Sequence, residues 1–274
     1  ITGPLDWSNL VLDISSVCLQ EARCSSSAKF VGTDFECETS FKHTKFNGEA
    51  SFNHAKFEDS VSFEKASFEQ HVTFLMTEFQ LDSTFDHVRY SKRVSFERAK
   101  FRGRASFYTS KFIGTAIFMR SKFENHVNFR SVEFRGDSSF EGATFKDESF
   151  FVHAEFRGTA LFNEAEKAEF EESADFRSVK FAGDANLSGV NLDASQFDNA
   201  DLTDVSFAGT KLRDANFESA LLSRATLFDA DLRGAKINGA VLGDIRIDDE
   251  TIFLGDPSND SDTSPHTLSA IRSR

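Results

Sequence analysis

The sequence lacks most features of a catalytic, metal-binding or membrane-spanning chain. Its three cysteines, Cys18, Cys24 and Cys37, form no Cys-x-x-Cys pair, which argues against a zinc site and favours a reducing compartment, the cytoplasm. No run of eighteen apolar residues occurs, so we expect no membrane insertion of this segment. Phosphate-binding loops, nucleophile elbows and His-Glu-x-x-His motifs are also missing, and we therefore expect no enzyme activity.

Positive charge is scarce in the second half of the chain. The formal net charge is −13, and residues 163–274 account for −11 of it, whereas residues 1–162 are nearly neutral. Nucleic-acid binding requires a basic surface that neutralises phosphates. We therefore expect no direct nucleic-acid binding.

An aromatic ring, in contrast, recurs at a fixed short spacing from Phe30 to Phe162. The spacing alternates between five and six residues, and Tyr90 occupies one of the positions. A small residue stands two positions before nearly every ring, as Ala55 does before Phe57. Neither a helical period nor strict alternation produces this spacing. A short repeat over more than a hundred residues indicates a solenoid, with the ring and the small residue facing inward.

The positions after each ring predict the corners of the coil. Twelve of the fifteen glycines fall two residues after a ring or its equivalent, including Gly32, Gly48 and Gly103. We expect a tight turn with positive φ at this position. Where the spacing is six, the extra residue is nearly always polar, which is typical of a bulge at an exposed corner.

The repeat resembles the pentapeptide-repeat family. Matching units are Ala55-Lys56-Phe57-Glu58-Asp59 and Ala230-Asp231-Leu232-Arg233-Gly234, and the resemblance covers Leu19 to Ile252. It implies an all-β solenoid, a right-handed quadrilateral β-helix with four sides per coil. Sides of five, six, five and six residues make a 22-residue coil, so Phe57 should stack on Phe79.

The repeat changes character in the second half. From Leu187 the spacing is five, and the inward positions, ending with Ile247 and Ile252, are mostly Leu and Ile. Coils of 20 residues have less interior to fill, and protein interiors are packed to constant density. We therefore expect two solenoid segments of different girth.

Five segments follow from these observations. We expect an N-terminal cap at 1–18, wide coils at 19–162, a bulge at 163–169, narrow coils at 170–252 and a polar tail or linker at 253–274. The bulge and the residues after it form the candidate partner-binding site. That site comprises Glu164, Glu166, Lys167, Glu169, Glu171 and Glu172.

Seven histidines could suggest a metal site, but the 22-residue register places His43 beside Lys65 and His54 beside Met76. No two histidines become neighbours, so we expect no metal and no cofactor.

The leading functional hypothesis is a rigid, non-catalytic scaffold for an unidentified protein partner. This segment could belong to a longer chain or form a homodimer through a solenoid end. Family resemblance leaves two alternatives: a DNA-mimic inhibitor of a type II topoisomerase, and a soluble module of a membrane protein such as an ion channel.

Overall fold

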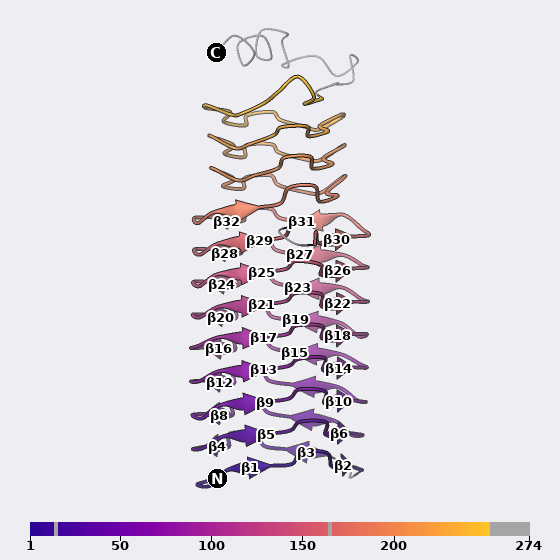
Figure 1. Ribbon diagram of the computed structural model, residues 1–274, viewed down its shortest axis with the longest axis vertical. Helices are drawn as coiled ribbons and strands as arrows, with labels where there is room; N and C mark the ends of the chain where they lie inside the picture. The colour runs from indigo at the N-terminus through magenta and orange to yellow at the C-terminus, as the bar shows by residue number, and fades with distance from the viewer. Residues whose placement is uncertain (14–15, 164–165, 253–274) are drawn as a thin grey trace.

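The backbone winds as a stack of coils along a straight rod (Figure 1). The computed structural model describes residues 1–13, 16–163 and 166–252. The named elements are 33 strands of two residues each, four to a coil. No helix in these ranges is long and apolar enough to cross a membrane.

The strands form four parallel sheets, one on each side of the coil. The β1 sheet contains β1 Leu5–Asp6, β5 Ala28–Lys29, β9 Ala50–Ser51, β13 Val72–Thr73, β17 Val94–Ser95, β21 Ala116–Ile117, β25 Ser138–Ser139, β29 Ala160–Leu161 and β33 Ala185–Asn186. The β2 sheet contains β2 Val11–Leu12, β6 Asp34–Phe35, β10 Lys56–Phe57, β14 Glu78–Phe79, β18 Lys100–Phe101, β22 Lys122–Phe123, β26 Thr144–Phe145 and β30 Glu169–Phe170. The β3 sheet contains β3 Val17–Cys18, β7 Thr39–Ser40, β11 Val61–Ser62, β15 Ser83–Thr84, β19 Ala105–Ser106, β23 Val127–Asn128, β27 Ser149–Phe150 and β31 Ala174–Asp175. The β4 sheet contains β4 Arg23–Cys24, β8 Lys45–Phe46, β12 Ser67–Phe68, β16 Arg89–Tyr90, β20 Lys111–Phe112, β24 Glu133–Phe134, β28 Glu155–Phe156 and β32 Lys180–Phe181.

The fold predicted from the repeat is confirmed: the chain is a quadrilateral parallel β-helix. Phe57 pairs with Phe79 in the next coil, and the two rings stack 5.3 Å apart with an interplanar angle of 1°. Within a coil, rings six residues apart meet edge-on, as Phe57 meets Phe63 at 6.3 Å and 83°, and rings five residues apart are tilted, as Phe52 and Phe57 are by 40°. Stacked and edge-on arrangements are both favourable for aromatic side chains.

The interior combines these rings with small residues that close the coil. Alanine and valine occupy most of the positions two before a ring, and they are buried. At some of these positions the hydroxyl of a Thr or Ser donates to a backbone carbonyl of the preceding coil, as Thr44 Oγ1 does to Leu19 O at 2.6 Å and Thr77 Oγ1 to Phe52 O at 2.7 Å. Cys24 is a buried free thiol, as the sequence predicted, and burial raises its pKa.

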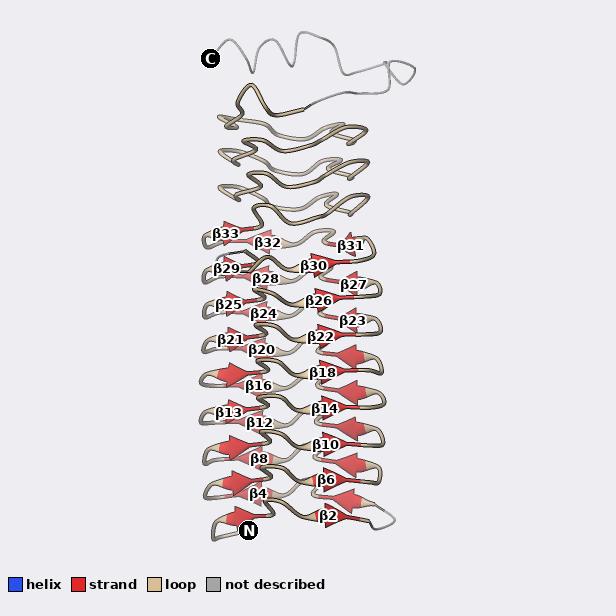
Figure 2. Cartoon of the chain, turned by 45° about the vertical axis from the view of Figure 1, so that its right-hand side comes forward, coloured by secondary structure: helices blue, strands red, loops and turns tan. Residues whose placement is uncertain are grey.

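The number of residues between paired positions increases from 22 to 25 at the insertion after Phe162. Phe145 pairs with Phe170, 25 positions on, and still stacks on it at 4.5 Å. The pairings on the other three sides also span 25 residues, and the bridges Asp175–Gln196 and Lys180–Asp201 that follow span 21. From Asn186–Ser206 to Thr226–Arg246 the bridges span 20 residues, and these coils are connected by isolated bridges in place of named strands (Figure 2).

The first residues differ from the separate cap expected at 1–18. Strands β1, β2 and β3 pair with β5, β6 and β7, so this segment contributes to the first coil. Trp7 packs edge-on against Phe30 at 5.7 Å and covers the first ring stack. The irregular spacing of the inward residues hid this coil, because backbone pairing does not require a Phe at each position.

Two details of the corners also correct the expectation. Positive φ occurs where the following gap is five residues, as at Gly32 and His43, and not at Gly48 or Gly136. A Cβ on Gly136 would lie 2.7 Å from the backbone of Gly114, so glycine there allows close approach of two coils.

Ile252 pairs with Asp231 in an outward position and is 39% exposed, so it is not a core residue. The tail expected at 253–274 lies outside the described residues.

Candidate functional site

In the insertion between Phe162 and Phe170 the structure describes Asn163 and residues 166–168, and we refer to these residues as the turn. Asn163 and Lys167 form an antiparallel bridge, and the N–H of Ala168 donates to the carbonyl of Phe162 at 2.7 Å. The chain therefore returns to its register directly after the turn, and the ring stack continues underneath it.

An ion pair holds this turn against the rod. Glu166 accepts two hydrogen bonds of 2.8 Å from Nε and Nη2 of Arg120, which lies 46 positions earlier in the chain. Hydrogen bonding by the Arg120 guanidinium lowers the pKa of the Glu166 carboxyl. Gly142 lies between the two partners, and a Cβ there would be 2.6 Å from Glu166 Oε2. The absence of a side chain at Gly142 thus makes room for the pair.

The structure places the described residues of the predicted site at three successive places along one coil. Glu166 and Lys167 are exposed in the turn, and Glu169 is exposed on β30. Glu171 and Glu172 lie at the next corner of the coil, where both are exposed. Glu164 falls outside the described residues.

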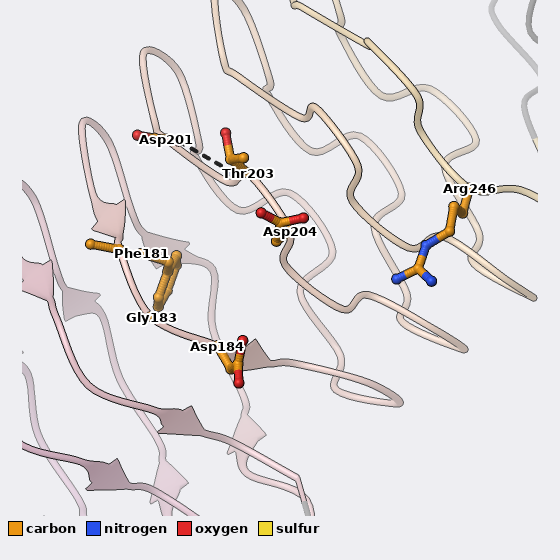
Figure 3. Close-up of a pocket in the computed structure, with 8 residues that line it drawn as sticks. Phe181, Gly183, Asp184, Asp201, Thr203, Asp204 and Arg246 are labelled. Carbon is orange, nitrogen blue, oxygen red and sulfur yellow. Dashed lines mark hydrogen bonds between the residues drawn. The ribbon is translucent and has the colours of Figure 1, made fainter.

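A cleft opens where the coil narrows, at the corner after β32. The wide coil turns through Ala182, Gly183 and Asp184, whereas the next coil turns through Thr203 and Asp204 alone. The corner of the narrow coil is one residue shorter, and a cavity of about 510 Å³ lies beside it (Figure 3). It is lined by Phe181, Ala182, Gly183, Asp184, Asp201, Thr203, Asp204 and Arg246.

The charges around this cleft are mainly negative. Asp184 and Asp204 come from neighbouring coils, and Arg246 extends from a later coil (Figure 3). Asp204 accepts a hydrogen bond from Arg224 Nε at 2.7 Å, which lowers the pKa of its carboxyl. Three aspartates line the cleft, but Arg224 neutralises Asp204 and Arg246 is itself a lining residue, so the net charge around the cleft is only about −1. Sequence reasoning missed it, although the change from six-residue to five-residue spacing after Phe181 marks its place.

Other chemistry is sparse in the parts of the chain that the structure describes. Within residues 1–13, 16–163 and 166–252, no group of three or more His, Cys, Asp or Glu side chains is arranged to hold a metal ion. His87 Nδ1 lies 2.5 Å from Thr109 Oγ1, and His126 Nδ1 lies 3.2 Å from Asp147 Oδ2, so these histidines take part in separate surface contacts.

Comparison with known protein families supports the repeat assignment. Two models described as pentapeptide repeats match the chain, one over residues 52–100 and the other over residues 183–218 and 206–244. The first match falls in the Phe-rich wide coils and the second in the narrow coils. No curated protein matches the chain.

Several solved structures are similar in fold. One is the pentapeptide repeat protein Rfr23 from the cyanobacterium Cyanothece 51142, at 21% identity and a TM-score of 0.28, with 44% of this chain matching 64% of that one. Another is HetL, a pentapeptide repeat protein involved in heterocyst differentiation regulation from Nostoc sp. strain PCC 7120, at 17% identity, 92% and 94% coverage and a TM-score of 0.23. A third is trypsin-treated QnrB1, a plasmid-mediated fluoroquinolone resistance protein, at 11% identity, 99% and 96% coverage and a TM-score of 0.25. Likenesses this low do not bear on the function of this chain.

Proposed function

Because this chain belongs to the pentapeptide-repeat family, we propose that it acts as a rigid, non-catalytic scaffold that binds a protein partner on its outer faces. One observation carries the proposal. Each coil is held in register on the next by parallel pairing and ring stacking, so outward side chains form fixed columns along the rod. A partner can then bind without ordering the scaffold first, which reduces the entropic cost of association.

The ion pairs of the acidic half favour this role over DNA mimicry. Asp231 accepts hydrogen bonds from both Arg213 and Arg233, and Asp204 is paired with Arg224. A mimic of the DNA backbone would present unbroken negative columns, whereas these columns alternate in sign. The three free cysteines further support a reducing compartment such as the cytoplasm.

The test is capture of a partner followed by a direct binding measurement. The immobilised full chain is exposed to lysate of the source organism, retained proteins are identified, and the strongest candidate is purified and titrated calorimetrically. The far-UV circular dichroism of the chain should stay unchanged on binding, because the scaffold is already formed. Chemical turnover of the captured molecule would overturn the non-catalytic role.

A supercoiling assay separates the scaffold from the mimic. We expect micromolar protein to leave DNA gyrase activity unchanged. Strong inhibition that disappears when Glu166, Glu171 and Glu172 become glutamine would favour mimicry instead.

A further inference from the structure

The outward column of the β4 sheet carries four bases and no acid over the first five coils of the rod. Strand pairing aligns Arg23 with Lys45 in one pair of coils and Arg89 with Lys111 in another, with Ser67 between the two pairs. Lys92 and Arg93 lie at the corner that follows Arg89. We call this set the basic face, and it comprises Arg23, Lys45, Arg89, Lys92, Arg93 and Lys111, all exposed.

These bases have almost no acidic partners. Within the described chain, five of the six have no carboxylate within ion-pair distance, and Lys111 has only Glu133, at 3.8 Å. Glu133 is already bound at 2.9 Å by both Arg135 and Arg157. Like charges that face each other across neighbouring strands are destabilising, so this ladder opposes the stability of the coil stack.

The opposite side of the same coils shows a different arrangement. The outward column of the β2 sheet alternates in sign through Asp34, Lys56, Glu78 and Lys100 before reaching Lys122. Lys56 is paired with Glu58 and Lys100 with Glu124, the latter at 3.1 Å, whereas Lys122 has no carboxylate within ion-pair distance in the described chain. The β2 column therefore alternates bases with acids over four coils, whereas the β4 column has four bases in five coils and no acid between them.

We propose that the basic face is the docking surface for an acidic segment of a protein partner. This assignment rests on the scaffold function proposed above and supplies the chemistry of its partner. Charge complementarity steers such a segment to this face and determines its position along the rod.

An acidic protein segment fits this surface better than a nucleic acid. Five coils at ~4.8 Å each give a basic column of roughly 20 Å between its end residues. Residues 163–274, which follow farther along the chain, carry most of the net charge of −13. A long polyanion would extend onto this acidic region and be repelled, whereas a short acidic segment ends before it.

A matched pair of charge-reversal variants tests the proposal. The double variant Arg89→Glu/Lys111→Glu alters neighbouring bases of the basic face. Its control, Lys100→Glu/Lys122→Glu, alters neighbouring bases of the β2 sheet in adjoining coils, with the same change in net charge. Circular dichroism and thermal melting establish that both variants fold.

The probe is a fluorescein-labelled twelve-residue peptide rich in glutamate, and anisotropy is measured against the full chain at two salt concentrations. We expect salt-sensitive binding that weakens about tenfold or more in the basic-face variant and changes less than about threefold in the control. Equal losses in both variants would reduce the effect to net charge and overturn the proposal, as would an absence of peptide binding. A labelled single-stranded DNA of equal charge that binds more tightly than the peptide would assign the face to nucleic acid. If a captured partner binds the basic-face variant with undiminished affinity, this docking surface is wrong while the scaffold function stands.

Discussion

The wide and narrow coils fill the same kind of interior with different side chains. One wide coil carries four rings, Phe96, Phe101, Phe107 and Phe112, whereas the narrow coil from Phe197 carries two rings and two leucines. All of these side chains are buried. Removing the sixth residue from two sides shortens the coil, and the rings on two of the four sides are replaced by leucine. Side length and core volume therefore change together, because interiors keep a constant packing density.

The contacts between aromatic rings are fewer in the narrow coils than in the wide coils. Phe96 stacks on Phe118 at 5.1 Å and 6°, and it meets Phe107 edge-on at 5.4 Å and 84°. In the narrow coils Phe197 still stacks on Phe217 at 4.9 Å and meets Phe207 edge-on at 5.8 Å and 85°, but leucines occupy the other two sides of its coil. The aromatic network thus covers all four sides of the coil in the first segment and is reduced to a few rings, Phe197, Phe207 and Phe217, in the second.

Loss of a ring in the wide coils should have the largest effect. Phe101 is fully buried between Phe79 and Phe123, at 4.7 and 4.8 Å. Phe101→Ala should cost ~3–5 kcal/mol, because the paired coils on each side cannot collapse into the space. Phe228→Ala is the control, since this ring is 40% exposed and should matter much less. Similar losses in denaturant unfolding for the two variants would contradict the assigned core.

Adding a ring to the narrow coils tests the difference in girth. Leu212 is fully buried, and Leu212→Phe should cost ~1–3 kcal/mol by overpacking. The control Leu221→Phe makes the same change at a side chain that is 41% exposed. If the melting temperatures of both variants match the parent protein, the narrow coils have room for more rings than we infer.

The junction between the segments depends on one serine. The N–H of Ala174 donates to Ser195 Oγ at 3.1 Å, where the corner loses its sixth residue. Ser195→Ala should cost ~1–3 kcal/mol, because it leaves a buried N–H without an acceptor. Ser25→Ala removes an exposed hydroxyl and serves as the reference. An unchanged unfolding free energy for Ser195→Ala would mean that another group accepts this hydrogen bond.

One substitution should improve the wide coils. Tyr90 is fully buried among phenylalanines, and its hydroxyl has no hydrogen-bond partner in the described structure. Burial raises the pKa of this phenol well above its usual value. Tyr90→Phe should raise stability by about 1 kcal/mol, because it removes an unsatisfied buried hydroxyl. A destabilised variant would indicate that the hydroxyl is satisfied.

The smallest effect concerns the turn at the junction. The folded-state pKa of Glu166 is lowered by Arg120, so the ion pair is complete above the unfolded pKa of about 4.3 and is lost as pH falls through the folded pKa. Because the pair is exposed, the change should be local rather than global. The NMR shift of Arg120 Nε–H should follow this titration and should become independent of pH in Glu166→Gln. A midpoint at the ordinary glutamate value would contradict the pairing.

Sequence alone predicted the stack of coils because spacing reports register directly. Phe57 and Phe79 are related by one coil, and no distant information is needed to pair them. The Arg120–Glu166 pair was not predictable in this way, since the insertion breaks the register and the partners lie two coils apart. The cleft likewise depends on Arg246, which comes from a later coil than Asp184 and Asp204. Positive φ was wrongly expected at Gly48 and Gly136, because glycine stands two residues after a ring at both kinds of corner. At five-residue corners glycine allows positive φ, whereas at six-residue corners it allows neighbouring coils to approach closely.

Regular register has a consequence for how the protein folds. Pairing partners in the wide coils are 22 residues apart in a chain of 274, a relative separation of about 0.08. That value lies in the range of helical bundles and well below that of most all-β domains, whose strands must find distant partners. Each finished coil offers a template to the next, so folding can advance along the rod in short steps. We therefore expect this all-β protein to refold at rates more typical of a helical one.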